Sequence, residues 1–180
     1  MTAMSPGSHH CVYLLSLLSL WIGACSPSHT DEDVVEPWVA PPPELQVYEI
    51  GYNEAGKTAA HTFTMVETGS VAPIVKGTQG AWMLVIAARC NALPPGKNRV
   101  TVEAELGPPG ETPYGKLKYK RRPVLDGGDG FRYLMNVFLV VSNNEEWDEQ
   151  ETALTVSIET EDGQKFEQTQ MIHLRKQMIE

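Results

Sequence analysis

Apolar and polar residues alternate along most of the chain after residue 45, and this period of two is the feature that most restricts the fold. The stretch 98–106 shows it well, because apolar residues take every second position and threonine and glutamate residues stand between them. The stretch 153–160 repeats the pattern. Successive side chains of a β-strand point to opposite faces. Each stretch is therefore expected to be a strand with one buried and one solvated face, as in antiparallel sheets.

Short turn sequences rich in glycine, proline and aspartate separate these stretches, most clearly at 93–96, 107–110, 126–130 and 161–163. Strands are expected at 45–50, 61–67, 71–75, 81–90, 98–106, 115–122, 131–141, 153–160 and 166–175. Regularly spaced short strands predict an all-β domain built as a sandwich or a barrel. Of the two, we expect a sandwich of about seven to nine strands. Only 144–150 is expected to form a short helix.

Two of the expected strands, 81–90 and 131–141, are apolar on both faces, which predicts a central place in the sheet. In the first, one face would carry Trp82, Leu84, Ile86 and Ala88. In the second, unbroken alternation would put five side chains on one face, namely Phe131, Tyr133, Met135, Val137 and Leu139.

The first 24 residues contain no Asp, Glu, Lys or Arg, and residues 11–24 are largely apolar. A helix needs about 20 apolar residues to cross a bilayer, whereas the apolar core of a secretory signal peptide has roughly 7–15. The stretch therefore predicts a signal peptide. The alternative is a buried apolar strand or helix that happens to precede a cysteine.

The end of this stretch, Ile22-Gly23-Ala24-Cys25, resembles the lipobox of bacterial lipoproteins, in which an aliphatic and two small residues precede a cysteine. The resemblance implies cleavage between Ala24 and Cys25 and attachment of lipid to the Cys25 thiol. Since more than one acyl chain gives stable anchoring, the mature chain would be held at a membrane. In the resembling family an aspartate after the cysteine favours the inner membrane, so Ser26 implies an outer-membrane lipoprotein, facing the periplasm or the cell surface.

The lipobox divides the chain into a signal peptide (1–24), a lipidated cysteine with a disordered linker rich in proline and acidic residues (25–44), and a β domain (45–180). Pro41-Pro42-Pro43 predicts a stiff polyproline II spacer. Cys11 would leave with the signal peptide and Cys25 would carry lipid, so no internal disulfide is expected. Cys90 ends an apolar strand and is expected to be buried and inert.

The centre of the chain carries a second resemblance. Residues 69–89, GSVAPIVKGTQGAWMLVIAAR, are similar to a segment of uncharacterised lipoproteins of myxobacterium-like bacteria, in which G-x-x-V-P-I-V-x-G-x-Q-G-G precedes a long apolar strand. Residues 72–80 carry the match, and Ala81 stands where the pattern has a second glycine. The resemblance implies an antiparallel, immunoglobulin-like β-sandwich and no known activity. The glycines at 77 and 80 themselves predict a tight turn.

The chain has 14 Lys and Arg against 23 Asp and Glu, a formal net charge of −9, which argues against nucleic-acid binding because phosphate needs a cationic surface. Basic residues nevertheless alternate at Lys116, Lys118, Lys120 and Arg122, so an unbroken strand would put all four on one face. Such a stripe would bind a polyanion or an acidic envelope partner. The alternative is protection of a sheet edge against aggregation.

Acidic residues offer two weaker candidate metal sites. Asp126 and Asp129 lie in a glycine-rich turn whose composition is similar to that of a calcium-binding loop. The third acidic position and the distal glutamate of an EF-hand loop are missing. Glu145, Glu146 and Asp148 belong to the densest acidic stretch, 143–151. A hairpin turn and a solvated loop are the simpler interpretations, and no metal or other cofactor is expected.

Residues with catalytic spacing do not stand out, since the sequence has no HxxxH pair, G-x-S-x-G elbow or P-loop. We therefore expect a non-catalytic, lipid-anchored binding or structural module of the cell envelope, with the membrane and an envelope protein or the cell wall as its partners. One alternative is a carbohydrate- or cell-wall-binding protein that uses exposed aromatic residues such as Trp38, Tyr114 and Trp147. The other is a calcium-dependent or enzymatic envelope protein. The sequence leaves the oligomeric state open.

Overall fold

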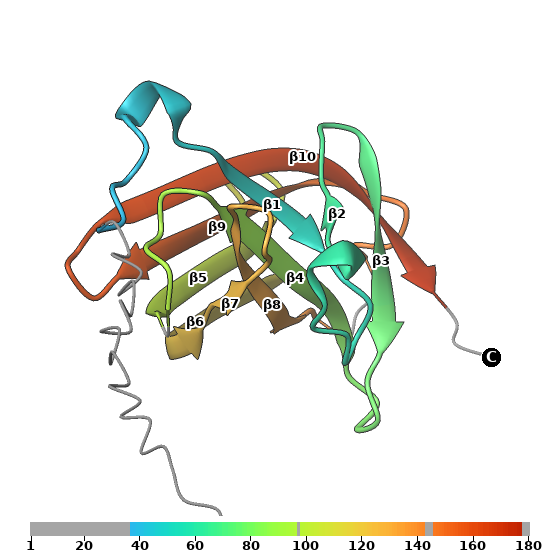
Figure 1. Cartoon of the computed structure of the whole chain (residues 1–180). Coiled ribbons are helices and arrows are strands. Elements are labelled where there is room, and N and C mark those ends of the chain that lie inside the picture. Colours follow the sequence, from blue (N-terminus) through green and yellow to red (C-terminus); the bar gives the residue numbers. More distant parts are fainter. Residues whose placement is uncertain (1–36, 97, 143–145, 178–180) are drawn as a thin grey trace, which may run out of the picture. The chain divides into compact units, whose positions relative to one another are not determined.

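The computed structural model describes residues 37–96, 98–142 and 146–177, all within the unit Pro37–Glu180 (Figure 1). The expected signal peptide, Cys25 and the start of the linker lie outside the described residues. In the described part, no helix is long and apolar enough to cross a membrane. Helical structure there is limited to two short 3-10 turns, η1 (Pro43–Leu45) and η2 (Ala60–Thr62).

Ten strands make up the rest of the fold, which confirms an all-β domain (Figure 1). They are β1 (Tyr48–Tyr52), β2 (Thr64–Met65), β3 (Ser70–Lys76), β4 (Trp82–Cys90), β5 (Arg99–Gly107), β6 (Gly115–Pro123), β7 (Leu125–Asp126), β8 (Arg132–Val140), β9 (Glu151–Thr160) and β10 (Lys165–Gln177). Each of the nine expected strands overlaps one of them, and only β7 has no counterpart. The helix expected at 144–150 is wrong in its described part, because residues 146–149 form a turn.

The strands form one continuous, curled sheet in the order β2-β1-β4-β3-β10-β9-β5-β6, with β8 also paired to β4 and β7 paired to β8. β4 divides one of its edges between two strands, since β3 pairs with residues 82–84 and β1 with residues 86–90. Pro73 gives a reason for this division. It has no amide proton to give to a ladder, and β3 pairs with β4 only from Ile74 onward.

The expectation of an antiparallel, immunoglobulin-like sandwich is corrected by β3. This strand runs parallel to β10 and antiparallel to β4, so the sheet is mixed. Because β3 pairs with both, it joins strands that would otherwise belong to two separate sheets. The tight turn expected between β3 and β4 is confirmed, since Gly77 N donates to the Ala81 carbonyl and Gly80 N to the Gly77 carbonyl, both at 2.8 Å.

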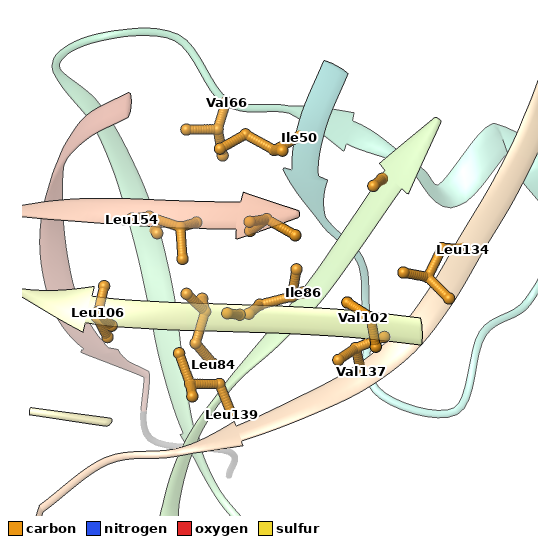
Figure 2. Close-up of a cluster of buried hydrophobic side chains, with 14 of the residues drawn as sticks. Ile50, Val66, Leu84, Ile86, Val102, Leu106, Leu134, Val137, Leu139 and Leu154 are labelled. Carbon is orange, nitrogen blue, oxygen red and sulfur yellow. The ribbon is translucent and has the colours of Figure 1, made fainter. Parts of the chain in front are cut away.

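One hydrophobic core fills the inside of the curl, and Figure 2 shows side chains converging on it from several strands. The apolar positions of β5 and β9 that the alternation predicts are buried: Val100, Val102, Ala104, Leu106, Leu154, Val156 and Ile158. Ser157, expected on the solvated face, is also buried. Cys90 is completely buried, as expected. Burial raises the pKa of its thiol, which keeps it protonated and weakly reactive.

A β-bulge in β8 changes which of its side chains share a face. Ile86 faces Val137 and Ala88 faces Leu134, so two residues of β8 oppose the single Ala87. Asn136, one of the two, has a φ of 54°. The extra residue reverses the alternation. Val137, Leu139 and Leu134 enter the main core, whereas Tyr133 and Met135 form a small second cluster with Ala87. The prediction that Phe131 to Leu139 share one face is therefore wrong beyond Met135.

The central place expected for β8 is also wrong. β8 pairs with β4 along its length, but among the described strands its other edge forms a ladder only with β7, at Arg132 and Tyr133. Part of its second apolar face is covered by Phe63, which packs with the Tyr133 cluster. Further along the strand, Phe138 and Val140 are 36% and 53% exposed.

Asn136 attaches the loop 53–57 to the bulge. Its side-chain oxygen accepts hydrogen bonds from Asn53 Nδ2 at 3.1 Å and Gly56 N at 2.9 Å, and its Nδ2 donates to the Lys57 carbonyl at 2.7 Å. Its backbone N donates to Asn53 Oδ1 at 3.2 Å. Asparagine also tolerates the left-handed backbone better than most residues. This one residue therefore supports both the bulge and the loop.

Two substitutions of Asn136 separate these roles. Asn136→Gly keeps the backbone conformation and loses the side-chain bonds, so unfolding should become easier by about 1–3 kcal/mol. Asn136→Ala should cost about 1 kcal/mol more, because alanine resists a positive φ. Chemical denaturation measures both. Unchanged stability of the glycine variant would contradict the role in holding the loop, and equal stability of the two variants would contradict the role of the backbone conformation.

Candidate functional site

Two of the basic residues of the expected stripe are neutralised by carboxylates. They lie on β6, the last strand in the order of the sheet and therefore an edge strand. Lys116 Nζ lies 2.8 Å from a carboxylate oxygen of Glu105, and Lys118 pairs with Glu103. Both carboxylates belong to the facing positions of β5. The Lys118 hydrogen bond lowers the pKa of the Glu103 carboxyl. These exposed ion pairs add little stability. They nevertheless leave the charges of Lys116 and Lys118 balanced by carboxylates within the chain.

The prediction that all four basic side chains share a face is wrong, because β6 also contains a bulge. Val102 faces Tyr119 and Val100 faces Arg122, so Lys120 and Arg121 together oppose one residue of β5. Arg121 has a φ of 58°. Directly opposed residues of neighbouring strands share a face. Arg122 therefore lies on the side of buried Val100, opposite to the paired lysines.

The side chain of Arg122 extends to β8, where Nη2 donates to the carbonyls of Asn136 at 3.0 Å and Met135 at 3.5 Å. We call the space between residues 119–122 of β6 and residues 135–138 of β8 the seam. Tyr119 Oη donates to the Phe138 carbonyl at 3.5 Å. β6 and β8 do not form a ladder among the described strands. The curled sheet is therefore closed here by side chains.

The exposed cations that the ion pairs leave over flank the seam, on the bulge residues of β6 that oppose Thr101. Lys120 and Arg121 are exposed, and neither forms an ion pair with a carboxylate in the described part of the chain. They adjoin Tyr119, which is 41% exposed and whose ring lies 5.9 Å from the Arg122 guanidinium. Arg122 Nε is buried without a hydrogen-bond partner among the described residues. On a chain with a net charge of −9, this local positive charge favours an acidic ligand.

A groove along the outer face of β3 is a second candidate site. Two adjoining cavities of about 560 and 380 Å³ share Tyr52, Pro73 and Gln177 in their lining. The groove lies where β3 and β1 part from each other along β4. Val71 and other apolar residues of β3 contribute to it, and polar side chains come from the loop after β1: Asn53, Glu54, His61 and Thr62. The volume is in the range of ligand-binding clefts.

Asp126 and Asp129 hold the β7–β8 turn in shape. Asp126 Oδ1 accepts hydrogen bonds from Arg132 Nη1 and Gly128 N, both at 2.9 Å. Asp129 accepts from Tyr133 Oη at 2.6 Å and from Phe131 N at 3.0 Å. These bonds are those expected of a hairpin turn, and they engage both carboxylates that the calcium interpretation would use.

The other candidate metal ligands lie at the far end of β8. Asp148 accepts a hydrogen bond from Lys176 N at 3.0 Å and lies 3.3 Å from Lys176 Nζ. Glu146 is exposed in the same turn, and Glu145 falls outside the described residues. The length of β8 separates the turn at 146–149 from the Asp126 and Asp129 carboxylates by roughly 26 Å. Among the described residues, no three acidic, histidine or cysteine side chains are grouped so that they could hold a metal ion.

The three aromatic residues expected to bind carbohydrate differ in their exposure to solvent. Trp147 is completely buried, donates from Nε1 to the Ser142 carbonyl at 2.8 Å and packs edge-on against Trp82 at 5.8 Å. Its expected exposure is wrong, because the turn at 146–149 directs it into the core. Tyr114 is half-buried against the same core. Trp38 is 40% exposed.

Sequence reasoning missed Tyr119, Arg121 and Phe138. The signal for Arg121 was present, since three consecutive basic residues at 120–122 cannot all continue an alternation. Nothing in the sequence indicated that β6 and β8 approach each other. Comparisons with family models, with curated proteins and with solved structures find no match to this chain.

The hydrogen bond between Tyr133 and Asp129 makes stability depend on pH. It lowers the pKa of the Asp129 carboxyl, and the Phe131 amide adds to the effect. Such a group stabilises the fold above its unfolded pKa of about 4, and this contribution disappears as the pH falls through the lower folded-state value. Asp129→Asn should therefore lose less stability than the unaltered protein between about pH 5 and about pH 2.

Denaturant titrations at several pH values measure this difference. Tyr133→Phe is the matched variant, because it keeps the carboxylate and removes only the hydroxyl donor. It should show a similarly reduced acid sensitivity. Identical acid sensitivity of the unaltered protein and both variants would show that this pair does not contribute.

Proposed function

We propose that this chain is a lipid-anchored protein of the bacterial cell envelope, held in the outer membrane through Cys25 and acting as a non-catalytic binding module. The observation that carries the proposal is the lipobox-like Ile22-Gly23-Ala24-Cys25 at the end of an uncharged, largely apolar stretch. The linker at 26–44 would then hold the β domain away from the membrane. Its acidic residues would be repelled by anionic head groups, which suits a spacer.

The β domain supports the binding part of this proposal through its surface. The seam offers exposed cations beside exposed aromatic rings, and the groove offers apolar and polar side chains in a concave site. Both surfaces are built on strands whose inner faces are fixed in one core. A rigid frame of this kind suits recognition, because little ordering is needed on binding.

Cell-wall glycan binding is the second candidate, and the groove along β3 is the observation that favours it. Tyr52 supplies an aromatic ring, and His61, Thr62 and Gln177 supply groups that hydrogen-bond sugar hydroxyls. This candidate uses other residues than the sequence indicated.

The anchoring proposal predicts that Cys25→Ser abolishes lipid attachment. The variant should leave the membrane fraction or stay unprocessed, since a serine hydroxyl cannot replace the acylated thiol. Membrane fractionation and intact-mass measurement check the result. Cys90→Ala is the matched control and should remain acylated and membrane-bound. Unchanged mass and partitioning of Cys25→Ser would rule out the lipoprotein assignment.

The glycan candidate predicts retention of the protein on purified peptidoglycan through the groove. The exposed residues His61 and Gln177 can be changed together to alanine without opening the core. Retention should fall by about tenfold, equivalent to the loss of one or two hydrogen bonds. Lys116→Gln with Lys118→Gln should bind as the unaltered protein does. Equal retention of both double variants would argue against the groove.

A further inference from the structure

Among the described strands, no backbone ladder covers the edge of β8 between β7 and Val140. Side chains cover it instead, and the backbone N of Asn136 is already bonded to Asn53. Phe138 presents its carbonyl to the seam, where Tyr119 Oη donates to it, and the N–H of a strand residue points to the same side as its carbonyl. Val137 and Leu139, the neighbours of Phe138 in β8, have their side chains buried in the core. Unpaired edges of this kind are templates for an additional strand.

Few bonds from β6 cover this edge in the described part of the chain, and only the bond from Arg122 to the Asn136 carbonyl, at 3.0 Å, has ordinary length. Of the three that Tyr119 and Arg122 make to β8 carbonyls, two have a length of 3.5 Å, at the limit of a hydrogen bond. An incoming backbone would replace them with ladder bonds of ordinary length. At the far end the strands meet closely, because a Cβ on Gly115 would lie 2.5 Å from the Val140 carbonyl oxygen. The seam can therefore admit a strand only beside residues 134–139.

The positive charges beside the seam favour an acidic ligand. Lys120 and Arg121 are exposed cations without an ion pair in the described part of the chain, on a protein that is otherwise acidic. Arg121 holds a φ of 58°, a conformation that suits glycine better than arginine. Strain of this kind is retained where the surroundings or a function require it. Exposed Phe138 and Val140 add apolar contacts on the same strand.

We propose that the seam binds an extended acidic peptide segment of a partner protein, which adds to the edge of β8 beside residues 134–139. Backbone pairing gives such a complex its affinity, and alternate side chains give it specificity. Carboxylates of the peptide would meet Lys120 and Arg121, and its apolar residues would lie beside Phe138. The proposal goes beyond membrane anchoring and does not require it, so the failure of either leaves the other standing.

The test uses the purified full chain in detergent and a synthetic peptide of alternating glutamate and valine. A length of about seven residues covers the open edge at roughly 3.3 Å per residue. A second peptide carries N-methyl groups on the amides of one edge, and a third replaces glutamate by lysine. Calorimetric titration should show binding of the first peptide. N-methylation should weaken it by about tenfold or more, and the lysine peptide should not bind.

Two double variants of β6 complete the test. Lys120→Gln with Arg121→Gly removes the seam cations, and glycine suits the backbone at 121. Lys116→Gln with Lys118→Gln removes the same charge from the ion-paired positions. The first should weaken binding by about tenfold, and the second by less than about twofold. Thermal melting confirms that both are folded.

Three results would overturn the proposal. The first is no binding of the acidic peptide. The second is equal weakening of binding by the two double variants. The third is equal affinity for the N-methylated and the unmodified peptide, which would indicate attraction of charge without strand addition.

Discussion

Arg122 holds together two edges of the sheet that no backbone ladder joins. Its guanidinium donates to the carbonyl of Asn136, the residue at the bulge of β8, and it is itself directed there by the bulge at Lys120 and Arg121. Without the bulge in β6, the side chain would point to solvent with the paired lysines. Without the bulge in β8, Val137 and Leu139 would not face the core. The closure of the curled sheet at the seam thus depends on two irregularities in facing strands. Beyond the seam, a backbone hydrogen bond of 2.8 Å from Ser142 N to the Tyr114 carbonyl also joins the two edges.

The regular part of the fold followed from the sequence, because alternation and turn residues report local geometry. Val100, Val102 and Ala104 were predicted to be buried together and are, and the turn at Gly77 is where the glycines indicate it. Strand direction was not predictable in the same way. The parallel pairing of β3 with β10 depends on contacts about 100 residues apart in the chain, and no local pattern encodes it.

The candidate site was less predictable than the fold for a related reason. A bulge moves every later side chain to the other face, so one unrecognised residue changed the interpretation of the basic stripe. Lys116 and Lys118 were found as exposed residues, but their pairing with β5 carboxylates depends on register. Trp147 was misplaced because a turn residue can point inward or outward with the same sequence pattern. The lipobox-like residues belong to a short linear motif, and its interpretation depends on no fold.

These features fit together as a tethered module. A signal and lipid anchor would fix its place, a single core would keep the strands rigid, and the irregular edges would carry recognition. The acidic character of the chain makes the small basic region at the seam distinct from its overall charge.

Amide hydrogen exchange along β8 tests most directly whether the seam is closed by side chains alone. The account predicts that the amide of Phe138, which points into the seam, exchanges at least about a hundredfold faster than those of Val137 and Leu139, which point toward β4. Equal protection of the three amides would mean that β6 and β8 are joined by backbone pairing, and it would contradict the open edge on which the account rests.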